Sequence, residues 1–446
     1  MKETESAFGA TNVIDHDLNK SKNFVFNFLS ACYLLAFATI GFGPLRLGFI
    51  YTDVTTYFIY IAFFFQVITN TLRLPRLLFG IYIYILIQSC VLNFKYVSFT
   101  LPNTFHFIGF VLYSFTIFSY ISVFRNKILE IIQKYYKFVL IISFIAIIQT
   151  VVFVAFGITI KPQFLLYGNQ SYPFKIEILN FLPRAIGLST EPAHFATLLL
   201  PGVYIAILML AGKSYSLNIN NRKHAVIILF AFILSFSIVG YFGLLLCLIA
   251  IYGSALKGKI FAKLALSAFF VGLSFIIYLS PLMNKVKTLP AMISNVDSYE
   301  FTSNDLSGFA LVTNLFIARN ALEESNFLGK GFNTHRDSYD KYIFKIFSGS
   351  QVIMEGLNRE GAGSLFIRIV SEFGLPGIGL FLFFMYHYWI KRDGNSTKLR
   401  NINNLSVIML ISYCARNGEY LNLFFFLFLA LTYYTHLMWT RANIVK

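Results

Sequence analysis

Long apolar runs separated by short polar segments occupy most of this 446-residue chain. A membrane-spanning helix needs about 20 predominantly apolar residues, and the runs at 24–43 and 139–158 are of this kind. The pattern predicts about twelve transmembrane helices, at residues 24–43, 54–70, 77–92, 103–123, 137–157, 191–211, 225–237, 240–255, 261–280, 366–389, 404–416 and 419–438.

Basic residues flank the apolar run 225–255 on both sides, with Arg222 and Lys223 before it and Lys257 and Lys259 after it. A hairpin keeps both basic clusters on one side of the membrane, whereas a single long span separates them. We therefore expect this run to break at 237–240 into two helices.

The composition agrees with a membrane protein. The chain is 57% hydrophobic and 13% charged, with a mean hydropathy of +0.67, whereas soluble proteins carry about 25% charged residues. We expect an all-α integral membrane protein. The four cysteines fall in predicted spans, so no disulfide framework is expected. The net charge of +16 is spread over many short loops, which argues against nucleic acid as a partner.

Lysine and arginine counts predict the orientation. With both termini inside, the inner segments hold 21 of these residues and the short outer segments hold 6. Short loops rich in Lys and Arg stay in the cytoplasm, so both termini are predicted to be cytoplasmic.

Five regions follow from these spans. Residues 1–23 and 441–446 are expected to form cytoplasmic tails, 24–280 the first nine spans, and 366–440 the last three. Residues 281–365 form a large outer loop, too long for a simple connection. The loop contains a helical pattern at 307–324, so we expect it to hold helical segments.

Within that pattern, Val312, Leu315, Phe316 and Arg319 follow the i, i+3, i+4, i+7 spacing of one helix face. Arg319 is therefore expected on the apolar face. Two interpretations remain open there: a role directed at a ligand, or a side chain that reaches toward lipid headgroups.

The segment RAIGLSTEPAHFATLLLP, residues 184–201, precedes a predicted span. Ser189 or Thr190 followed by Pro is typical of a helix start. Glu191 and His194 are three residues apart, so they share one helix face. Glu191 is either a site residue or simply an acid that favours the helix N-terminus.

The span from 366 begins with Arg368 and Glu372, an i, i+4 pair at the predicted outer membrane edge. A structural ion pair is the alternative to a binding role. The sequence GLPG at 374–377 predicts a kink or a close helix approach.

Further charged residues fall on the same predicted side. Arg416 and Glu419 lie at the turn between the last two spans, and His335 and Arg336 follow a glycine-rich turn in the large loop. Arginines can bind pyrophosphate oxygens in a bidentate manner, and carboxylates and histidines can act as general bases. Residues with typical zinc-ligand spacing are not apparent, so no metal is predicted.

These motifs together resemble the O-antigen polymerase family (Wzy type), within the group that also contains O-antigen ligases. The resemblance covers residues 180–440 and depends on RAIGLSTEPAHFATLLLP, the large outer loop, FLGKGFNTH at 327–335, and GSLFIRIVSEFGLPGIGLFLF at 363–383. Ligases of this group resemble one another in a histidine at the position of Gly363, so its absence favours a polymerase.

The resemblance implies a glycosyltransferase at the periplasmic face of the bacterial inner membrane, which joins oligosaccharide repeat units carried on polyprenyl pyrophosphate. The implied partners are these lipid-linked glycans, the bilayer and a chain-length co-polymerase, and no cofactor is implied. The predicted catalytic residues are Glu191 (as the base or as a group that orients the acceptor), His194, Arg319 and His335. The predicted substrate-binding residues are Arg184, Arg336, Arg368, Glu372 and Arg416.

Two alternatives stay open. An O-antigen ligase transfers the glycan to a lipid A core and is disfavoured by Gly363. A flippase for the lipid-linked unit suits twelve spans, but it has little need of a large outer loop, and it is expected to place polar residues along the span midplanes.

Overall fold

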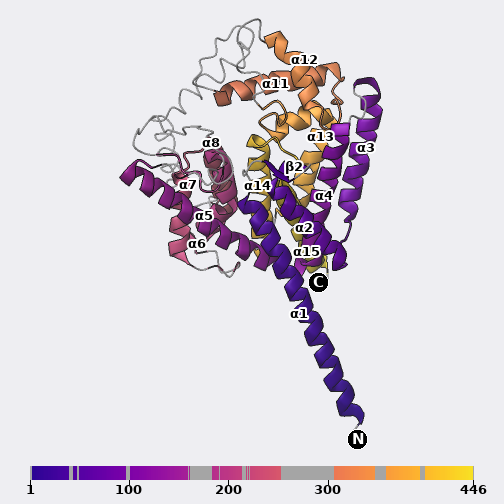
Figure 1. Ribbon diagram of the computed structural model, residues 1–446, viewed down its shortest axis with the longest axis vertical. Helices are drawn as coiled ribbons and strands as arrows, with labels where there is room; N and C mark the ends of the chain where they lie inside the picture. The colour runs from indigo at the N-terminus through magenta and orange to yellow at the C-terminus, as the bar shows by residue number, and fades with distance from the viewer. Residues whose placement is uncertain are drawn as a thin grey trace.

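The computed structural model describes residues 3–39, 44–47, 50–96, 101–158, 160, 183–189, 191–212, 217, 219, 221–252, 306–346, 358–391 and 397–444. These residues are mostly helical (Figure 1). The N-terminal helices are α1 (Glu3–Ala38), α2 (Val54–Ile68), α3 (Arg76–Tyr96), α4 (Leu101–Val123) and α5 (Ile128–Phe156), with a short 3₁₀ helix at Arg125–Lys127. The remaining helices are α6 (Pro192–Leu210), α7 (Arg222–Ile233), α8 (Ile238–Tyr252), α11 (Leu306–Glu324), α12 (His335–Ile346), α13 (Leu365–Tyr388), α14 (Thr397–Arg416) and α15 (Leu423–Ile444).

Helices long and apolar enough to cross a membrane confirm a helical membrane protein. Five such helices occur among the described residues, at Asn103–Val123, Arg125–Phe156, Pro192–Leu210, Leu365–Tyr388 and Leu423–Ile444. Eleven of the twelve expected spans lie on helices, and the expected span 261–280 lies outside the described residues. The full number of membrane crossings remains a prediction.

The run 225–255 does break, at 234–237, between α7 and α8. A Cβ on Gly240 would lie 2.7 Å from Ala196 and 3.1 Å from Phe232, and a Cβ on Gly202 would lie 3.5 Å from Ile228. Along α6 from residue 196 to residue 202, the neighbouring residues of α7 run from 232 back to 228. The two helices are therefore antiparallel. The chain reverses between α7 and α8, and both helices pack against α6 as the expected hairpin.

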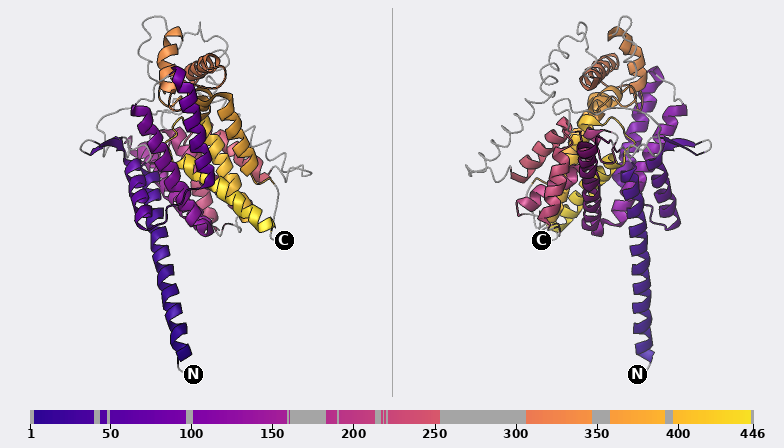
Figure 2. Two further views of the ribbon diagram at one scale, coloured as in Figure 1. Left: turned by 90° about the vertical axis from the view of Figure 1, so that its right-hand side faces the viewer. Right: turned by 60° about the vertical axis from the view of Figure 1, so that its left-hand side comes forward.

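The N-terminal segment differs from the expectation. Residues expected as a tail instead continue the first helix back to Glu3, and α1 extends beyond the bundle (Figure 2). A two-stranded antiparallel hairpin, β1 (Pro44–Leu47) and β2 (Ile50–Asp53), follows it. This hairpin is a local departure that the sequence did not predict, and it does not change the all-α class that the helices confirm.

Helix α14 lies inside the bundle, in contact with α6, α8, α13 and α15. Its buried face includes Asn401, Asn403, Asn404 and Ser406. The Asn403 amide donates to the Tyr388 and Thr432 carbonyls at 3.0 Å each, and its oxygen accepts from the Ile390 N–H at 2.8 Å. Because neighbouring helices surround this part of α14, the Asn403 side chain bonds within the protein and does not meet lipid.

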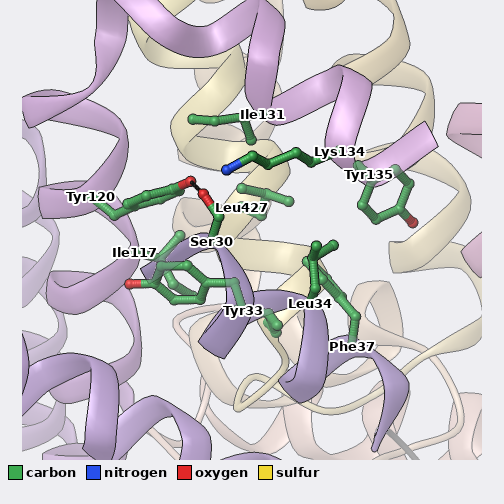
Figure 3. Close-up of a pocket in the computed structure, with 11 residues that line it drawn as sticks. Ser30, Tyr33, Leu34, Phe37, Ile117, Tyr120, Ile131, Lys134, Tyr135 and Leu427 are labelled. Atoms are coloured by element: carbon green, nitrogen blue, oxygen red, sulfur yellow. Dashed lines mark hydrogen bonds between the residues drawn. The ribbon is translucent and has the colours of Figure 1, made fainter. Parts of the chain in front are cut away.

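A smaller set of polar contacts joins α1 to α4 and α5. They lie beside a cavity of about 30 Å³ that is also lined by α15, and Figure 3 shows Lys134 pointing into it. Ser30 and Tyr120 form a hydrogen bond of 2.8 Å across one wall. Lys134 donates to Asn27 at 2.8 Å and lies 4.0 Å from the centroid of Phe26. These contacts tie α1 to α4 and α5.

The two ends of the bundle differ. Helices α11 and α12 lie together at one end, and the C-terminus lies at the other, which is also the end from which α1 projects (Figures 1 and 2). The described part of the large loop is therefore a helical cap over one end of the bundle. The start of α13 and the end of α14 meet beneath this cap, where the Ser364 hydroxyl donates to the Cys414 carbonyl at 2.9 Å.

Candidate functional site

The motif around Glu191 forms the start of α6. Glu191 is itself the N-cap, with an extended backbone (φ −134°, ψ 150°), and Pro192 occupies the first helical position. Ser189 was one of two expected caps, so the cap lies one or two residues later than predicted. Proline at this position fits because its missing N–H has no intrahelical partner there. The Glu191 side chain makes no capping hydrogen bond and is free to point elsewhere.

Glu191 pairs with Arg416 at the end of α14. The Arg416 Nη2 to Glu191 Oε2 distance is 3.3 Å, and the side chains are 25% and 40% exposed. Arg416 also donates to the Gly363 carbonyl at 3.4 Å. Both contacts are long, and a guanidinium has five N–H donors. Arg416 therefore keeps donors available for a further anion.

A polar pocket of about 250 Å³ lies beside this pair. Its polar lining residues are Thr55, Tyr113, Ser189, His194, Thr197, Asn417, Glu419 and Asn422. The His194 imidazole interacts with the side chains of Glu191, Arg416 and Asn417. The structure thus brings Glu191, His194 and Arg416 together, although Glu191 and Arg416 are 225 positions apart in the sequence.

Glu419 was recognised at this turn but was not predicted as a site residue. Its main-chain carbonyl accepts from the Tyr413 hydroxyl at 3.0 Å, and its exposed side chain lines the pocket. The signal in the sequence was its position three residues after Arg416, within the turn that joins two predicted spans.

Arg368 and Glu372 form the predicted i, i+4 pair at 2.8 Å, but with side chains only 5% and 0% exposed. Arg368 also donates to the Gly418 carbonyl at 2.8 Å and to Asn333 Oδ1 at 2.6 Å, and it lies 4.3 Å above the Tyr420 ring. Glu372 accepts from the Tyr420 hydroxyl at 2.8 Å. Burial raises the pKa of Tyr420 well above its usual value, so this hydroxyl stays protonated and donates. The charged groups of Arg368 and Glu372 therefore make their hydrogen bonds to other groups of the protein.

His335 belongs to the same buried network. Its Nδ1 lies 2.8 Å from the Ser371 hydroxyl and its Nε2 lies 2.9 Å from Asn314 Oδ1. The Asn314 amide group donates to the Ala310 carbonyl, so its oxygen accepts from Nε2–H. Burial, together with the nearby Arg368 charge, lowers the pKa of His335 to about 3. The histidine is neutral and has no exposed surface, which removes the basis for its predicted catalytic role.

The loop before His335 pairs with α13 through main-chain hydrogen bonds. Lys330 and Gly331 donate to the Ser371 and Glu372 carbonyls at 3.0 and 2.7 Å, and Leu375 donates to Phe327 at 2.9 Å. Here α13 is interrupted at Gly374, which has φ 61° and ψ −155°. The GLPG sequence therefore supplies the predicted kink, and the close approach there is that of the loop 327–331 rather than of another helix.

Arg184 holds the turn of the α7–α8 hairpin. Its guanidinium donates to the Ser235 carbonyl at 3.3 Å and to the Phe236 carbonyl at 2.9 Å. The neighbouring Ala185 N–H donates to Leu234 at 2.9 Å. Burial lowers the pKa of Arg184 from its ordinary value. Arg184 therefore positions the chain that leads into Glu191, while its donors toward the hairpin are occupied.

The expectation that Arg319 lies on a buried face is wrong. Its side chain is 76% exposed and pairs with Glu323 at 2.8 Å. The buried face of α11 contains Ala310, Thr313, Asn314, Ile317, Ala318 and Ala321. Leu315, on the face of Arg319, is 43% exposed. Val312 of the expected face is buried, but the rest of the buried face is made mostly of small and amide residues, and Leu315 and Arg319 point outward.

Arg336 also lies on the surface of the cap. It pairs with Glu360 at 3.2 Å, with both side chains more than half exposed. It does not join the pocket that contains His194. Within the described residues, no group of three or more His, Cys, Asp or Glu side chains is placed to hold a metal ion.

No protein-family model, no curated protein and no solved structure matches this chain. The functional assignment therefore depends on the sequence motifs and on the geometry of the site.

Proposed function

We propose that this protein is a polysaccharide polymerase that joins oligosaccharide repeat units carried on a polyprenyl pyrophosphate. One observation carries the proposal: Glu191, His194 and Arg416 meet beside a polar pocket at the end of apolar helices. A carboxylate, an imidazole and an arginine at the membrane edge suit a reaction between a sugar hydroxyl and a lipid-linked pyrophosphate. The resemblance of the surrounding motifs to the polymerase family supports the same reaction.

The proposed step exchanges one bond at the anomeric carbon. The acceptor sugar hydroxyl attacks this carbon, its proton passes to Glu191, and the bond from the carbon to the pyrophosphate oxygen breaks. The pyrophosphate leaves on its lipid with the bonding electron pair. Arg416 stabilises the charge that develops on it, because an arginine binds phosphate oxygens in a bidentate manner and remains charged.

The Glu191–Arg416 pair has a role in this scheme before the substrate binds. Its long contact of 3.3 Å is a weak one for an arginine and a carboxylate. A pyrophosphate that takes over Arg416 releases Glu191 to accept a proton. His194 and Glu419 line the pocket and orient the acceptor hydroxyl.

In this proposal the buried network positions the site and does not contact the substrate. Arg368 binds the Gly418 carbonyl, and Tyr413 binds the Glu419 carbonyl, so the two central residues of the turn 417–420 are fixed. A Cβ on Gly418 would lie 1.2 Å from the Gly361 carbonyl oxygen, so the turn and the cap are in direct main-chain contact. The cap therefore helps to hold Asn417 and Glu419 in the pocket wall.

The test is a strain that lacks the protein, complemented with variants and analysed by gel electrophoresis of its surface polysaccharide. We expect the deletion to leave single repeat units. We expect Glu191→Gln and Arg416→Gln to reduce polymer formation by roughly 10²–10³, as the loss of one positioned charge contact does. Glu360→Gln and Arg359→Gln, on the exposed cap, are matched controls that keep the ladder.

Other outcomes contradict the proposal. Normal polymer with Glu191→Gln protein at its usual level shows that Glu191 is not the base. Long polymer stranded on the carrier in the deletion strain identifies a ligase, and single units trapped at the inner leaflet identify a flippase.

A further inference from the structure

A second, larger cavity lies on the other side of the chain segment 420–426 from the polar pocket. It has a volume of about 580 Å³ and lies between α3, α4, α13 and α15. We call it the α3 slot. Its lining is apolar except at one end, and includes Ile81, Ile85, Phe110, Phe373, Phe384 and Phe426. Cavities of about 300–1,000 Å³ are large enough for a ligand of small-molecule size.

The α3 slot follows the height of the bundle. Phe332 and Tyr420, which belong to the buried network beneath the cap, close one end. Arg76 and Tyr388 mark the other end, at the first residue of α3 and the last of α13. Arg76 is exposed and also acts electrostatically on Tyr433, in the second half of α15. The cationic end therefore lies toward the C-terminus, away from the candidate site.

Helix α3 is held near its first turns by Tyr82, which bonds to Ser114 of α4 at 2.7 Å, and by polar contacts at its other end. Gln88 donates to the Leu328 and Glu372 carbonyls at 3.1 and 2.9 Å, and Ser89 accepts from the Phe332 N–H at 3.3 Å. In Figure 1, α3 stands at the edge of the molecule. Its outward face and the adjoining face of α13 carry exposed apolar side chains, namely Phe79 at 56%, Leu380 at 49% and Phe383 at 62%. The slot is therefore bordered by surface that is suited to contact lipid chains.

The charge distribution selects the occupant. Among the described residues, Arg76 has no carboxylate partner, and an arginine at the end of an apolar membrane helix attracts an anionic headgroup. The pyrophosphate of a lipid-linked glycan belongs at the opposite end, beside Arg416. We propose that the α3 slot binds an acyl chain of an anionic glycerophospholipid whose phosphate contacts Arg76. This lipid fills the space between α3 and α13 and stabilises the bundle from the leaflet opposite the candidate site.

Glycines provide a direct test of the chain site. A Cβ on Gly80 meets no atom within 4 Å, although Gly80 lines the slot, so Gly80→Phe can place a ring there without a clash at Cβ. Gly379 is equally open but lies outside the lining, which makes Gly379→Phe the matched control. Arg76→Gln removes the cation, and Arg222→Gln, an exposed arginine at the first residue of α7, which does not line the slot, is its control.

The measurement is native mass spectrometry of the detergent-purified protein with phosphatidylglycerol, phosphatidylcholine or polyprenyl phosphate added. We expect one phosphatidylglycerol per wild-type chain. We expect roughly tenfold weaker binding for Gly80→Phe, because chain methylenes lose their buried contacts. For Arg76→Gln we expect the preference for phosphatidylglycerol over phosphatidylcholine to disappear. Both controls should bind as the wild type does.

Size-exclusion chromatography confirms that each variant is folded, and Arg76→Gln tests the headgroup contact even if Gly80→Phe does not fold. Unchanged phosphatidylglycerol binding in folded Gly80→Phe overturns the proposal, as does unchanged headgroup preference in Arg76→Gln. Displacement of phosphatidylglycerol by equimolar polyprenyl phosphate also overturns it, by assigning the slot to the carrier lipid. Loss of polymerase activity in Glu191→Gln tests a different site, so the two proposals can fail separately.

Discussion

Charged residues near the cap fall into two classes that their sequence positions do not distinguish. Arg368 and Glu372 are buried, and their polar atoms are bonded to protein groups. Arg416 and Glu191 are partly exposed and joined by a long contact. A buried ion pair is costly to break because the remaining charge has no water. The first pair therefore belongs to the structure, whereas the second can exchange partners with a ligand.

Removing Glu372 should destabilise the protein strongly. Glu372→Leu leaves Arg368 buried without a counter-ion and removes the acceptor of the Tyr420 hydroxyl. We expect a loss of about 3–5 kcal/mol in the free energy of unfolding, measured by denaturant titration in detergent. Glu360→Gln, which breaks an exposed pair on the cap, should leave the transition unchanged. Equal stability of the two variants would show that the Arg368–Glu372 pair is not buried as described.

His335 predicts a pH dependence of stability. Its pKa is lowered to about 3 in the folded protein, from an ordinary value of about 6.5, by burial and by Arg368. The unfolded chain therefore binds a proton between these pH values that the folded chain does not. Stability should fall as the pH decreases from about 6.5 toward 3, by up to about 1.4 kcal/mol per pH unit from this group.

The comparison that isolates this effect is His335→Gln. Glutamine can bond to Asn314 or Ser371 but does not titrate, so the slope between pH 6 and about 4 should become shallower than in the wild type. Parallel slopes in the two proteins would contradict the neutral, buried state of His335.

At the scale of elements, the break in α13 joins the cap to the membrane helices. A Cβ on Gly374 would lie 2.2 Å from the Phe327 carbonyl oxygen, and a Cβ on Gly329 would lie 2.4 Å from the Gly374 nitrogen. Both glycines have positive φ, at 61° and 80°. This contact therefore requires glycine at both positions, 329 in the loop and 374 in α13.

We expect Gly374→Ala to loosen the cap. The added methyl group must displace the main chain at 327–329, and its residue must adopt an unfavourable φ. Limited proteolysis should then cleave α11 or α12 faster than in the wild type. Gly379→Ala adds a methyl group in open space on the same helix and should not change the rate. Equal protection of both variants would show that the glycine contact does not hold the cap.

Hydrophobic periodicity predicted the helices well, because apolar runs of span length have few alternatives in a membrane. The flanking charges predicted the α7–α8 hairpin, and the GLPG motif predicted the break in α13. The periodicity failed at α11, where a cap helix buries alanine and asparagine and exposes Leu315. It also missed the helical start of α1, since a polar sequence gives no apolar pattern.

The site was predictable only in part. Glu191 and His194 share the first turn of α6, as their spacing indicated. Their meeting with Arg416 depends on how α6 and α14 pack, and no local pattern encodes this contact. The sequence did not indicate burial either: His335 and Arg336 are neighbours, yet His335 is buried and Arg336 is exposed.

At the scale of the whole molecule, the two ends have different chemistry. The cap lies at one end and the C-terminus at the other (Figure 1). The Glu191–Arg416 pair and the polar pocket lie beside the turn 417–420, beneath the cap, and the cationic end of the α3 slot lies at the opposite end. A polymerase of lipid-linked units needs its pocket on the side where those units are displayed. The proposed function therefore requires that the cap end of the bundle faces the periplasm.

Cysteine labelling in intact cells tests this orientation. Cys32, Cys247 and Cys414 are buried, so replacing the exposed Cys90 by serine gives a weakly reactive background. A membrane-impermeant maleimide should then label Glu360→Cys on the cap in intact cells, and Ile444→Cys at the end of α15 only after lysis. The Glu360 side chain is 64% exposed and Ile444 is 74% exposed, so access does not limit the reaction. The reverse pattern would place the pocket in the cytoplasm, on the side opposite to the proposed reaction, and the polymerase proposal would fail with it.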